Sequence, residues 1–138
     1  MAQNQQDEYR MGLAFPLRLD KRLDSDGRLV AATLAACTYE EHIKQSLRTL
    51  LLTSRQQRIM RRDFGNRLGD YLFENIGPTT AALARNEIIN TIENYEPRVE
   101  IDDVKVRAGK ELGVINIEIL YKIASTGVAD RLALSIGR

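Results

Sequence analysis

The sequence Ile-Asn-Ile-Glu-Ile-Leu-Tyr-Lys-Ile at positions 115–123 has the clearest structural pattern in the chain. Apolar residues occupy every second position from Ile115 to Ile123, and most of the positions between them are polar. Because successive side chains of a β-strand point to opposite faces, this alternation predicts a strand with one buried face and one more polar face. We therefore expect a sheet that packs against helices on one side.

Similar alternation occurs on both sides of this strand. Positions 99–106 alternate as well, but the pattern shifts by one residue at Asp102-Asp103, which predicts a strand with a β-bulge. After a turn signal at 125–127, alternation resumes and predicts a third strand that runs to the C-terminus and contains Leu132, Leu134 and Ile136. We expect an antiparallel meander, in which the last strand is a natural edge.

Three segments with helical spacing precede the meander. The first begins at Thr38, which can form a capping box with Glu41, and its apolar stripe is Ile43, Leu47, Leu50 and Leu51. The second covers about Asn66 to Glu74 and ends at Gly77-Pro78. The third is expected to be capped by Thr79 or Thr80 and to stop at Pro97, with a stripe of Ala81, Ala84, Ile88, Ile92 and Tyr95. The predicted class is α+β, with about three helices on one face of a small antiparallel sheet in a single domain.

The N-terminal part has weaker patterns. Residues 1–11 are mostly polar and are expected to form a flexible tail, which leaves residues 12–138 as the domain. Residues 24–27 are a turn signal of Asp, Ser and Gly. The small apolar residues of segment 28–36 are compatible with a strand or a loop, and the sequence does not choose between them.

Composition excludes several classes of function. The 138 residues include 20 basic and 19 acidic side chains, so the net charge of +1 gives the whole molecule no general attraction to nucleic acid or to anionic membranes. No segment has the length of a membrane-spanning helix, and the N-terminus lacks the apolar core of a signal peptide. We expect the protein to be made in the cytoplasm and to remain there unless it is packaged into a particle.

Catalytic and metal-binding patterns are weak. His42 is the only histidine and has no ligand partner at helical spacing, and the lone Cys37, among small apolar neighbours, is best interpreted as a buried structural thiol. Dinucleotide, phosphate-loop and nucleophile-elbow motifs do not occur in the sequence. We therefore predict no metal, no cofactor, no small-molecule substrate and no catalytic residue.

One carboxylate is a candidate for the general acid of a glycosidase. Glu96 follows the third helix, but Arg98 is placed to form an ion pair with it. Ion pairing lowers the pKa of a glutamate, which is the wrong direction for a general acid. A muramidase activity based on Glu96 is kept only as the alternative function.

A local basic cluster lies between the first two helices. It consists of Arg55, Arg58, Arg61, Arg62 and Arg67, with Phe64 and Tyr71 nearby. Arginine forks bind carboxylates and phosphates, so the cluster is interpreted as a partner-binding surface or, equally, as a solvated linker. The acidic run Glu100, Asp102 and Asp103 favours complementary protein surfaces over nucleic acid, although a small DNA-binding module stays open as a third hypothesis.

Four motifs occur in the order found in one protein family. They are Gly12-Leu13-Ala14-Phe15-Pro16-Leu17, the segment Gln-Ser-Leu-Arg-Thr-Leu-Leu-Leu-Thr at 45–53, Asp63-Phe64-Gly65 followed by Leu68, and Tyr95-Glu96-Pro97-Arg98-Val99. Across residues 12–123 the chain resembles the baseplate wedge proteins of contractile-tailed phages, which include baseplate assembly protein W and type VI secretion counterparts. It departs from them where Gln56-Gln57 replace Gly-Glu and Arg62 replaces proline.

The resemblance implies a structural subunit of the virion baseplate, assembled in the host cytoplasm. It also implies that the partners are the sheath protein and other wedge proteins, and that Glu96, Pro97 and Arg98 form a structural motif. An edge strand leaves backbone groups unpaired, so we predict that the sheath docks by β-augmentation on the strand of Leu132, Leu134 and Ile136.

Overall fold

The computed structural model of the chain describes residues 12–14, 16–72 and 76–137. The predicted tail at 1–11, Phe15 of the first family motif and the predicted end of the second helix near Glu74 lie outside these residues. Contacts divide the chain into two compact units, residues 1–45 and 46–138, and each is described by itself. The predicted domain extent of 12–138 stays a prediction.

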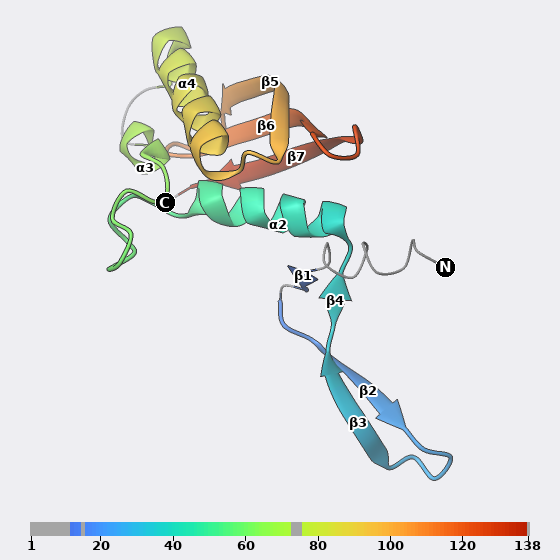
Figure 1. Cartoon of the computed structure of the whole chain (residues 1–138). Helices are drawn as coiled ribbons and strands as arrows, with labels where there is room; N and C mark the ends of the chain where they lie inside the picture. The colour runs from blue at the N-terminus through green and yellow to red at the C-terminus, as the bar shows by residue number, and fades with distance from the viewer. Residues whose placement is uncertain (1–11, 15, 73–75, 138) are drawn as a thin grey trace. The chain divides into compact units, whose positions relative to one another are not determined.

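The first unit contains two separate antiparallel pairs of strands: β1 (Gly12–Leu13) with β4 (Ala36–Cys37), and β2 (Leu19–Leu23) with β3 (Leu29–Leu34) (Figure 1). Every residue of β2 and β3 is exposed. The segment that the sequence left open as strand or loop is therefore extended and forms β3 and β4.

The β2–β3 connection is the predicted turn. The carboxylate of Asp24 accepts hydrogen bonds from the backbone N–H groups of Asp26 at 3.0 Å and Arg28 at 2.7 Å, and Gly27 has a φ of 76°. A short carboxylate side chain that bonds the following backbone, combined with a glycine at positive φ, is the usual chemistry of a tight reversal.

Helix α2 (Tyr39–Leu52) begins with the predicted capping box. The Thr38 hydroxyl accepts a hydrogen bond from the Glu41 N–H at 3.3 Å, and the Glu41 carboxylate accepts one from the Thr38 N–H at 3.0 Å. The predicted stripe is buried along the whole helix, with Ile43, Leu47, Leu50 and Leu51 all at most 2% exposed.

The second unit contains two further helices, α3 (Leu68–Tyr71) and α4 (Pro78–Tyr95). The predicted caps Thr79 and Thr80 are wrong, because Gly77 is the N-cap and Pro78 is the first helical residue. Proline suits this position, since its missing N–H would be unpaired there in any case. The predicted start of the second helix at Asn66 is two residues early, because the Asn66 side chain bonds the Leu68 N–H instead of joining the helix.

The meander has the predicted order β5 (Val99–Ala108), β6 (Ile115–Ile123) and β7 (Ala129–Ile136), all antiparallel. The register shifts between Ile101 and Asp103, which confirms the bulge. Along β6 the residues of the predicted apolar face, Ile115, Ile117, Ile119, Tyr121 and Ile123, are all buried, whereas Asn116 and Lys122 are exposed.

Helix α4 packs along β5 and lies over one face of the sheet (Figure 1). Its buried residues Ala84, Ile88 and Ile92 belong to the predicted stripe and share the interior with the buried face of β6. The α+β class, with three helices and antiparallel sheets in the described residues, is confirmed. In the described part of the chain, no helix is both long and apolar enough to cross a membrane.

Candidate partner-binding loop and sheet edge

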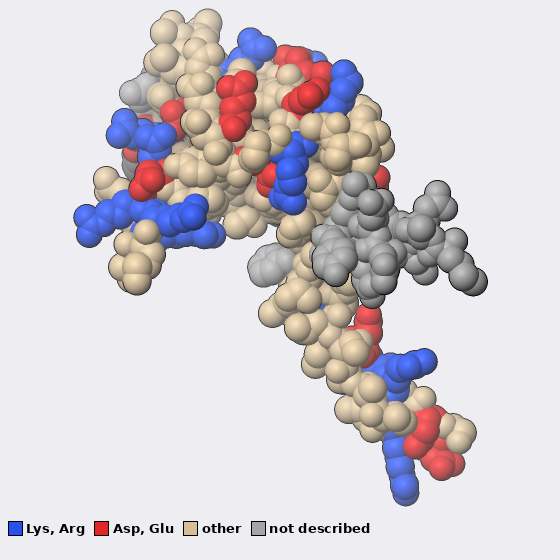
Figure 2. Space-filling view, viewed as in Figure 1, with Lys and Arg blue, Asp and Glu red and all other residues tan. Residues whose placement is uncertain are grey.

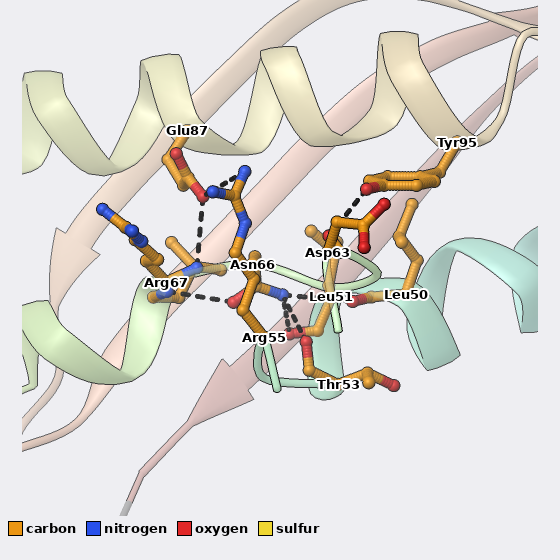
Figure 3. Close-up of polar contacts among 10 residues, drawn as sticks. Leu50, Leu51, Thr53, Arg55, Asp63, Asn66, Arg67, Glu87 and Tyr95 are labelled. Carbon is orange, nitrogen blue, oxygen red and sulfur yellow. Dashed lines mark hydrogen bonds and ion pairs between the residues drawn. The ribbon is translucent and has the colours of Figure 1, made fainter. Parts of the chain in front are cut away.

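The segment 53–67 between α2 and α3, here called the arginine loop, is held at its base by one buried amide. The Asn66 side chain is 2% exposed. Its Nδ2 group donates to the backbone carbonyls at the end of α2, those of Leu50 (3.1 Å), Leu51 (2.8 Å) and Thr53 (3.2 Å), and its Oδ1 atom accepts from the Leu68 N–H at 2.9 Å (Figure 3). One side chain therefore satisfies the last carbonyls of one helix and the first amide of the next.

Gly65 brings the two ends of the loop together. Its φ is 107°, and a Cβ atom at this position would lie 2.4 Å from the Thr53 carbonyl oxygen. The close approach allows the Asn66 N–H to donate to the Thr53 oxygen at 3.0 Å and the Arg55 N–H to donate to the Asn66 oxygen at 3.0 Å. Only glycine meets both the conformational and the steric requirement here.

Helix α4 holds the C-terminal side of the loop. The Tyr95 hydroxyl donates to the Asp63 carbonyl oxygen at 2.6 Å (Figure 3), and the Tyr95 ring meets the Phe64 ring edge to face at 5.1 Å. The Arg58 guanidinium lies 4.3 Å from the centre of the Phe64 ring, within the range of a cation–π contact. The family motif Asp63-Phe64-Gly65 is therefore an attachment point between loop and helix.

A carboxylate on α4 makes the second attachment. Glu87 Oε1 accepts a hydrogen bond from the Arg67 N–H at 3.2 Å and lies 3.7 Å from Arg55 Nη2 (Figure 3). Its side chain is only 18% exposed. A polar hollow of about 240 Å³ lies beside this point and is lined by Ser54, Arg55, Gln56, Asn66, Arg67, Gly69 and Asp70.

The five arginines of the predicted cluster do not all have the same role. Arg55 and Arg58 contact Glu87 and Phe64, so they stabilise the loop. The side chains of Arg61, Arg62 and Arg67 make no ion pair within the described part of the chain. Figure 2 shows basic side chains gathered where Figure 1 draws the connection between α2 and α3. Whether the cluster binds a partner stays a prediction.

Two carboxylates of the acidic run on β5, Asp102 and Asp103, are paired inside the chain. Asp102 lies 3.0 Å from Lys122 Nζ, and Asp103 lies 3.4 Å from Arg85 and 3.8 Å from Lys105. These carboxylates are therefore already paired with cations on α4 and on the sheet.

Glu96 is a buried ion-pair partner rather than an open carboxylate. Its side chain is 4% exposed, and its Oε1 and Oε2 atoms accept from Arg98 Nε at 2.5 Å and from Arg98 Nη2 at 2.7 Å. Oε2 also accepts from the Ser46 hydroxyl at 2.6 Å, which links the α4–β5 corner to α2. Both oxygens are engaged with protein donors, so the geometry is that of a structural corner.

Strand β7 is at the edge of its sheet, with β6 as its neighbour in the described residues. The Ile123 N–H donates to the Val128 oxygen at 2.9 Å, and hydrogen-bonded pairs alternate along an antiparallel ladder. With the observed register, the backbone groups of Leu132, Leu134 and Ile136 therefore point toward β6. The unpaired backbone groups of this edge belong to the alternate residues Ala129, Arg131, Ala133 and Ser135.

The predicted docking side chains face the interior side of the sheet, because their cross-strand neighbours on β6 are the buried residues Ile119, Ile117 and Ile115. Leu132 is 4% exposed, and Leu134 and Ile136 are half-buried. The assignment of this strand to the sheath stays a prediction. The sequence could identify the strand, but the register was needed to tell which of its residues present free N–H and C=O groups.

A partly buried polar pair lies where β6 meets β7. The Tyr121 hydroxyl donates to the Asp130 carboxylate at 3.2 Å. Burial, the negative charge of Asp130 and this hydrogen bond all raise the pKa of the Tyr121 hydroxyl well above its ordinary value. The neutral form is therefore the one that the fold stabilises.

The remaining candidates lie in the first unit. Cys37 is 5% exposed, as predicted for a structural thiol, and its sulfur donates to the Gly12 and Leu13 oxygens at 3.4 Å and 3.6 Å. The His42 ring packs so closely on Gly12 that a Cβ there would lie 2.3 Å from Nδ1. Within the described ranges, His, Cys, Asp and Glu side chains do not gather in groups of three or more that could bind a metal.

The family comparison covers three of the four motifs and leaves out the motif at 12–17. The family described as baseplate wedge protein gp25 matches residues 37–128. The chain belongs to this family. The resemblance inferred from the four motifs is thus confirmed, and the match includes the arginine loop, the Glu96–Arg98 corner and the first two strands of the meander.

Among individual relatives, the baseplate wedge protein gp25 of Enterobacteria phage T4 is 40% identical over 81 residues. The match covers 59% of this wedge-family chain and 61% of the T4 protein.

Two solved structures are similar in both sequence and fold. A crystal structure from Geobacter sulfurreducens, named as a candidate tail lysozyme, has a TM-score of 0.68 and 33% identity over 76% of this chain and 96% of that chain. A chain in the baseplate of the anti-feeding prophage has a TM-score of 0.66 and 30% identity over 83% and 85% of the two chains. A chain of the type VI secretion baseplate complex, at 18% identity and a TM-score of 0.56, covers 71% of this chain and 92% of that chain and shares the fold.

Sequence reasoning did not identify Asn66, Glu87 or the hydroxyl of Tyr95 as parts of the site. Tyr95 was assigned to the apolar stripe, and Asn66 to the start of a helix. The Gly65-Asn66 pair was a usable signal, since asparagine side chains in turns bond the backbone N–H two residues on, as Asn66 does with Leu68. Nothing local indicated Glu87, which lies 20 residues from Arg67 in sequence.

Proposed function

We propose that this chain is a structural wedge subunit of a contractile-tail baseplate, and that it anchors the first sheath subunit through the free edge of β7. The family membership and the likeness to a baseplate chain support the assembly. The observation that carries the docking site is the edge position of β7, with the backbone groups of Ala129, Arg131, Ala133 and Ser135 directed away from β6.

The docking mechanism is β-augmentation. An incoming extended segment of the sheath subunit pairs with the outward N–H and C=O groups of β7 and becomes the next strand of the sheet. The interior-facing Leu132 holds β7 against the core, so the edge is rigid before docking. Preorganisation lowers the entropy that is lost on binding.

Other wedge proteins are the proposed partners of the arginine loop. Arg61, Arg62 and Arg67 supply guanidinium groups for carboxylates, while Glu96, Pro97 and Arg98 hold the helix-to-strand corner and need no contact with a partner. The proposed location is the virion baseplate, after assembly in the host cytoplasm.

The docking proposal is tested best by a proline at a residue of β7 whose backbone groups point away from β6. Ala133→Pro removes one outward N–H and leaves the ladder with β6 intact, and proline is tolerated on edge strands for this reason. We expect particles with tail tubes but without sheath in electron micrographs, together with an unchanged unfolding temperature of the purified variant. Ala133→Val, which keeps the N–H, is the matched control and should assemble sheath normally. Normal sheath on Ala133→Pro would refute the assignment.

A truncation is less informative. Deleting residues 128–138 should also stop sheath attachment, but it removes the buried Leu132 and exposes the buried face of β6. The single substitution separates docking from folding.

Peptidoglycan cleavage is the second candidate, and the name of the Geobacter sulfurreducens relative favours it. A general acid must present a protonated oxygen to the leaving group. Both oxygens of Glu96 are bound by Arg98, and one also by Ser46. The purified chain should therefore leave peptidoglycan turbidity unchanged, and clearing that disappears in Glu96→Gln would establish the enzyme.

A further inference from the structure

The apex of the arginine loop carries two apolar side chains in water. Ile59 is 91% exposed and Met60 is 96% exposed. They are adjacent in sequence, and the three residues that border them most closely are Arg58, Arg61 and Arg62. Isolated exposed apolar residues are common on protein surfaces, but an adjacent pair at a loop apex within an arginine cluster is a recognisable interface composition.

The loop is fixed at its base, so the apex is presented in a defined position. The Gln56 N–H donates to the Arg62 oxygen at 2.9 Å and closes the apical turn. Below it, Asn66, Tyr95 and Glu87 connect the loop to α2, α3 and α4 through the bonds described above. Because the base is already ordered, little conformational entropy remains to be lost when the apex binds.

The charge around the apex selects the partner. Residues 55–67 contain five arginines, no lysine, and Asp63 as their one acidic residue. Arg55 and Arg58 are engaged by Glu87 and Phe64, whereas Arg61 and Arg62 make no ion pair in the described part of the chain. These two guanidinium groups follow Met60 directly and are available to carboxylates beside whatever pocket receives the apolar pair.

The composition of the apex favours a protein partner over nucleic acid or an anionic membrane. Protein interfaces are enriched in Met and Arg and depleted in Lys, which matches this apex. Single-stranded nucleic acid is usually held by stacking on aromatic side chains, and the apex has none. Membrane-surface segments are typically amphipathic helices with a large apolar face, whereas this apex is a tight loop with two apolar side chains.

We propose that Ile59 and Met60 insert as a plug into an apolar pocket on another baseplate wedge protein, and that acidic side chains at the rim of this pocket bind Arg61 and Arg62. The inference rests on the proposed wedge function for the identity of the partner. It adds the binding residues, their division between anchoring and contact, and the chemistry of the complementary surface.

The test uses the full-length chain and the purified wedge subcomplex of the same tail, prepared without this chain. The double variant Ile59→Ser/Met60→Ser should raise the Kd at least tenfold, since burying one large apolar side chain changes an equilibrium constant by about that factor or more. Leu112→Ser is the matched control, because Leu112 is 100% exposed in a different turn, and it should leave the Kd unchanged.

The charge component has its own readout. Arg61→Glu/Arg62→Glu should weaken binding by at least tenfold at low salt and by less at high salt, because screening weakens exposed charge pairs. The serine variants should lose affinity to the same extent at both salt concentrations. A photo-reactive amino acid in place of Met60 should cross-link to a wedge protein at a site bordered by Asp or Glu.

Several outcomes would overturn the proposal. Equal Kd values for wild type and Ile59→Ser/Met60→Ser would remove the plug while leaving the wedge function intact. Binding of the wild type to phosphatidylglycerol vesicles or to duplex DNA, lost in the same variant, would replace the protein pocket by a lipid or a nucleic acid. Failure of the wild type to bind the wedge subcomplex would overturn both this inference and the proposed function. Sheath attachment to the Ala133→Pro variant tests the proposed function alone.

Discussion

Replacing Asn66 by alanine should be among the most destabilising single changes in this chain. The Asn66 amide is buried and bridges the end of α2 and the start of α3. Its two N–H groups serve three backbone carbonyls, at 2.8–3.2 Å, and its oxygen accepts from the Leu68 N–H at 2.9 Å. Alanine removes all of these bonds and leaves the backbone groups in place.

The expected size follows from the number of bonds lost. Two donated hydrogen bonds and one accepted hydrogen bond, at about 1 kcal/mol each, amount to about 3 kcal/mol of unfolding free energy. Burial adds to the cost, since Leu50 and Leu51 are 2% and 1% exposed and their carbonyls have little access to replacement water. For a chain of this length, such a loss lowers the unfolding temperature by roughly 10 °C.

Urea unfolding monitored by circular dichroism measures this loss. The midpoint should fall while the m-value stays constant, because the surface exposed on unfolding hardly changes. Asn90→Ala is the matched control: Asn90 is exposed on α4, and its variant should stay within about 0.5 kcal/mol of wild type. If Asn66→Ala were as stable as this control, the amide would not hold the arginine loop and the explanation would be wrong.

Three further predictions concern other positions. Gly65→Ala should lower the free energy of unfolding, measured in urea, by at least about 2 kcal/mol, because residue 65 has a φ of 107° and a Cβ there would lie 2.4 Å from the Thr53 oxygen. Gly77→Ala is the control and should lose little stability, because a Cβ at that position meets nothing within 4 Å. Tyr121 has a raised pKa in the folded state, so stability is fully present below the unfolded-state pKa of about 10 and should fall as pH rises above it, by up to about 1.4 kcal/mol per pH unit. Tyr121→Phe should abolish this part of the slope, and an unchanged slope would contradict the assignment. Glu96→Gln should lower stability by about 2 kcal/mol, because it removes the negative charge from the buried side of a half-buried ion pair with Arg98, and a neutral result would show that the corner does not depend on that charge.

The structure agrees with the sequence patterns that depend only on residues close to one another in the chain. The capping box of α2 and the alternation of β6 each depend on residues within one turn or one strand, and these interactions form in the same way in any fold that contains the element. The bulge at Asp102-Asp103 could be predicted because one extra residue in a strand shifts the alternation of apolar and polar side chains by one position.

Expectations that depended on distant residues were less accurate. Asn66 was predicted to begin a helix, but its side chain donates hydrogen bonds to the carbonyls at the end of α2 instead. The close approach of the backbone at Gly65 brings these carbonyls within reach. The arginine cluster was visible as a composition, yet its division into anchoring and available side chains depends on Glu87 and Phe64.

The sequence by itself determined the three helices, the α+β class, the order of the meander and the family, because these follow from local periodicity and from motifs in a given order. Only the tertiary structure decided which residues of β7 present free backbone groups, how Arg98 and Ser46 bind the carboxylate oxygens of Glu96, and where the apex of the arginine loop lies. Each of these depends on strand register or on contacts between residues far apart in the chain, and such contacts are set by packing, which leaves no local signature in the sequence.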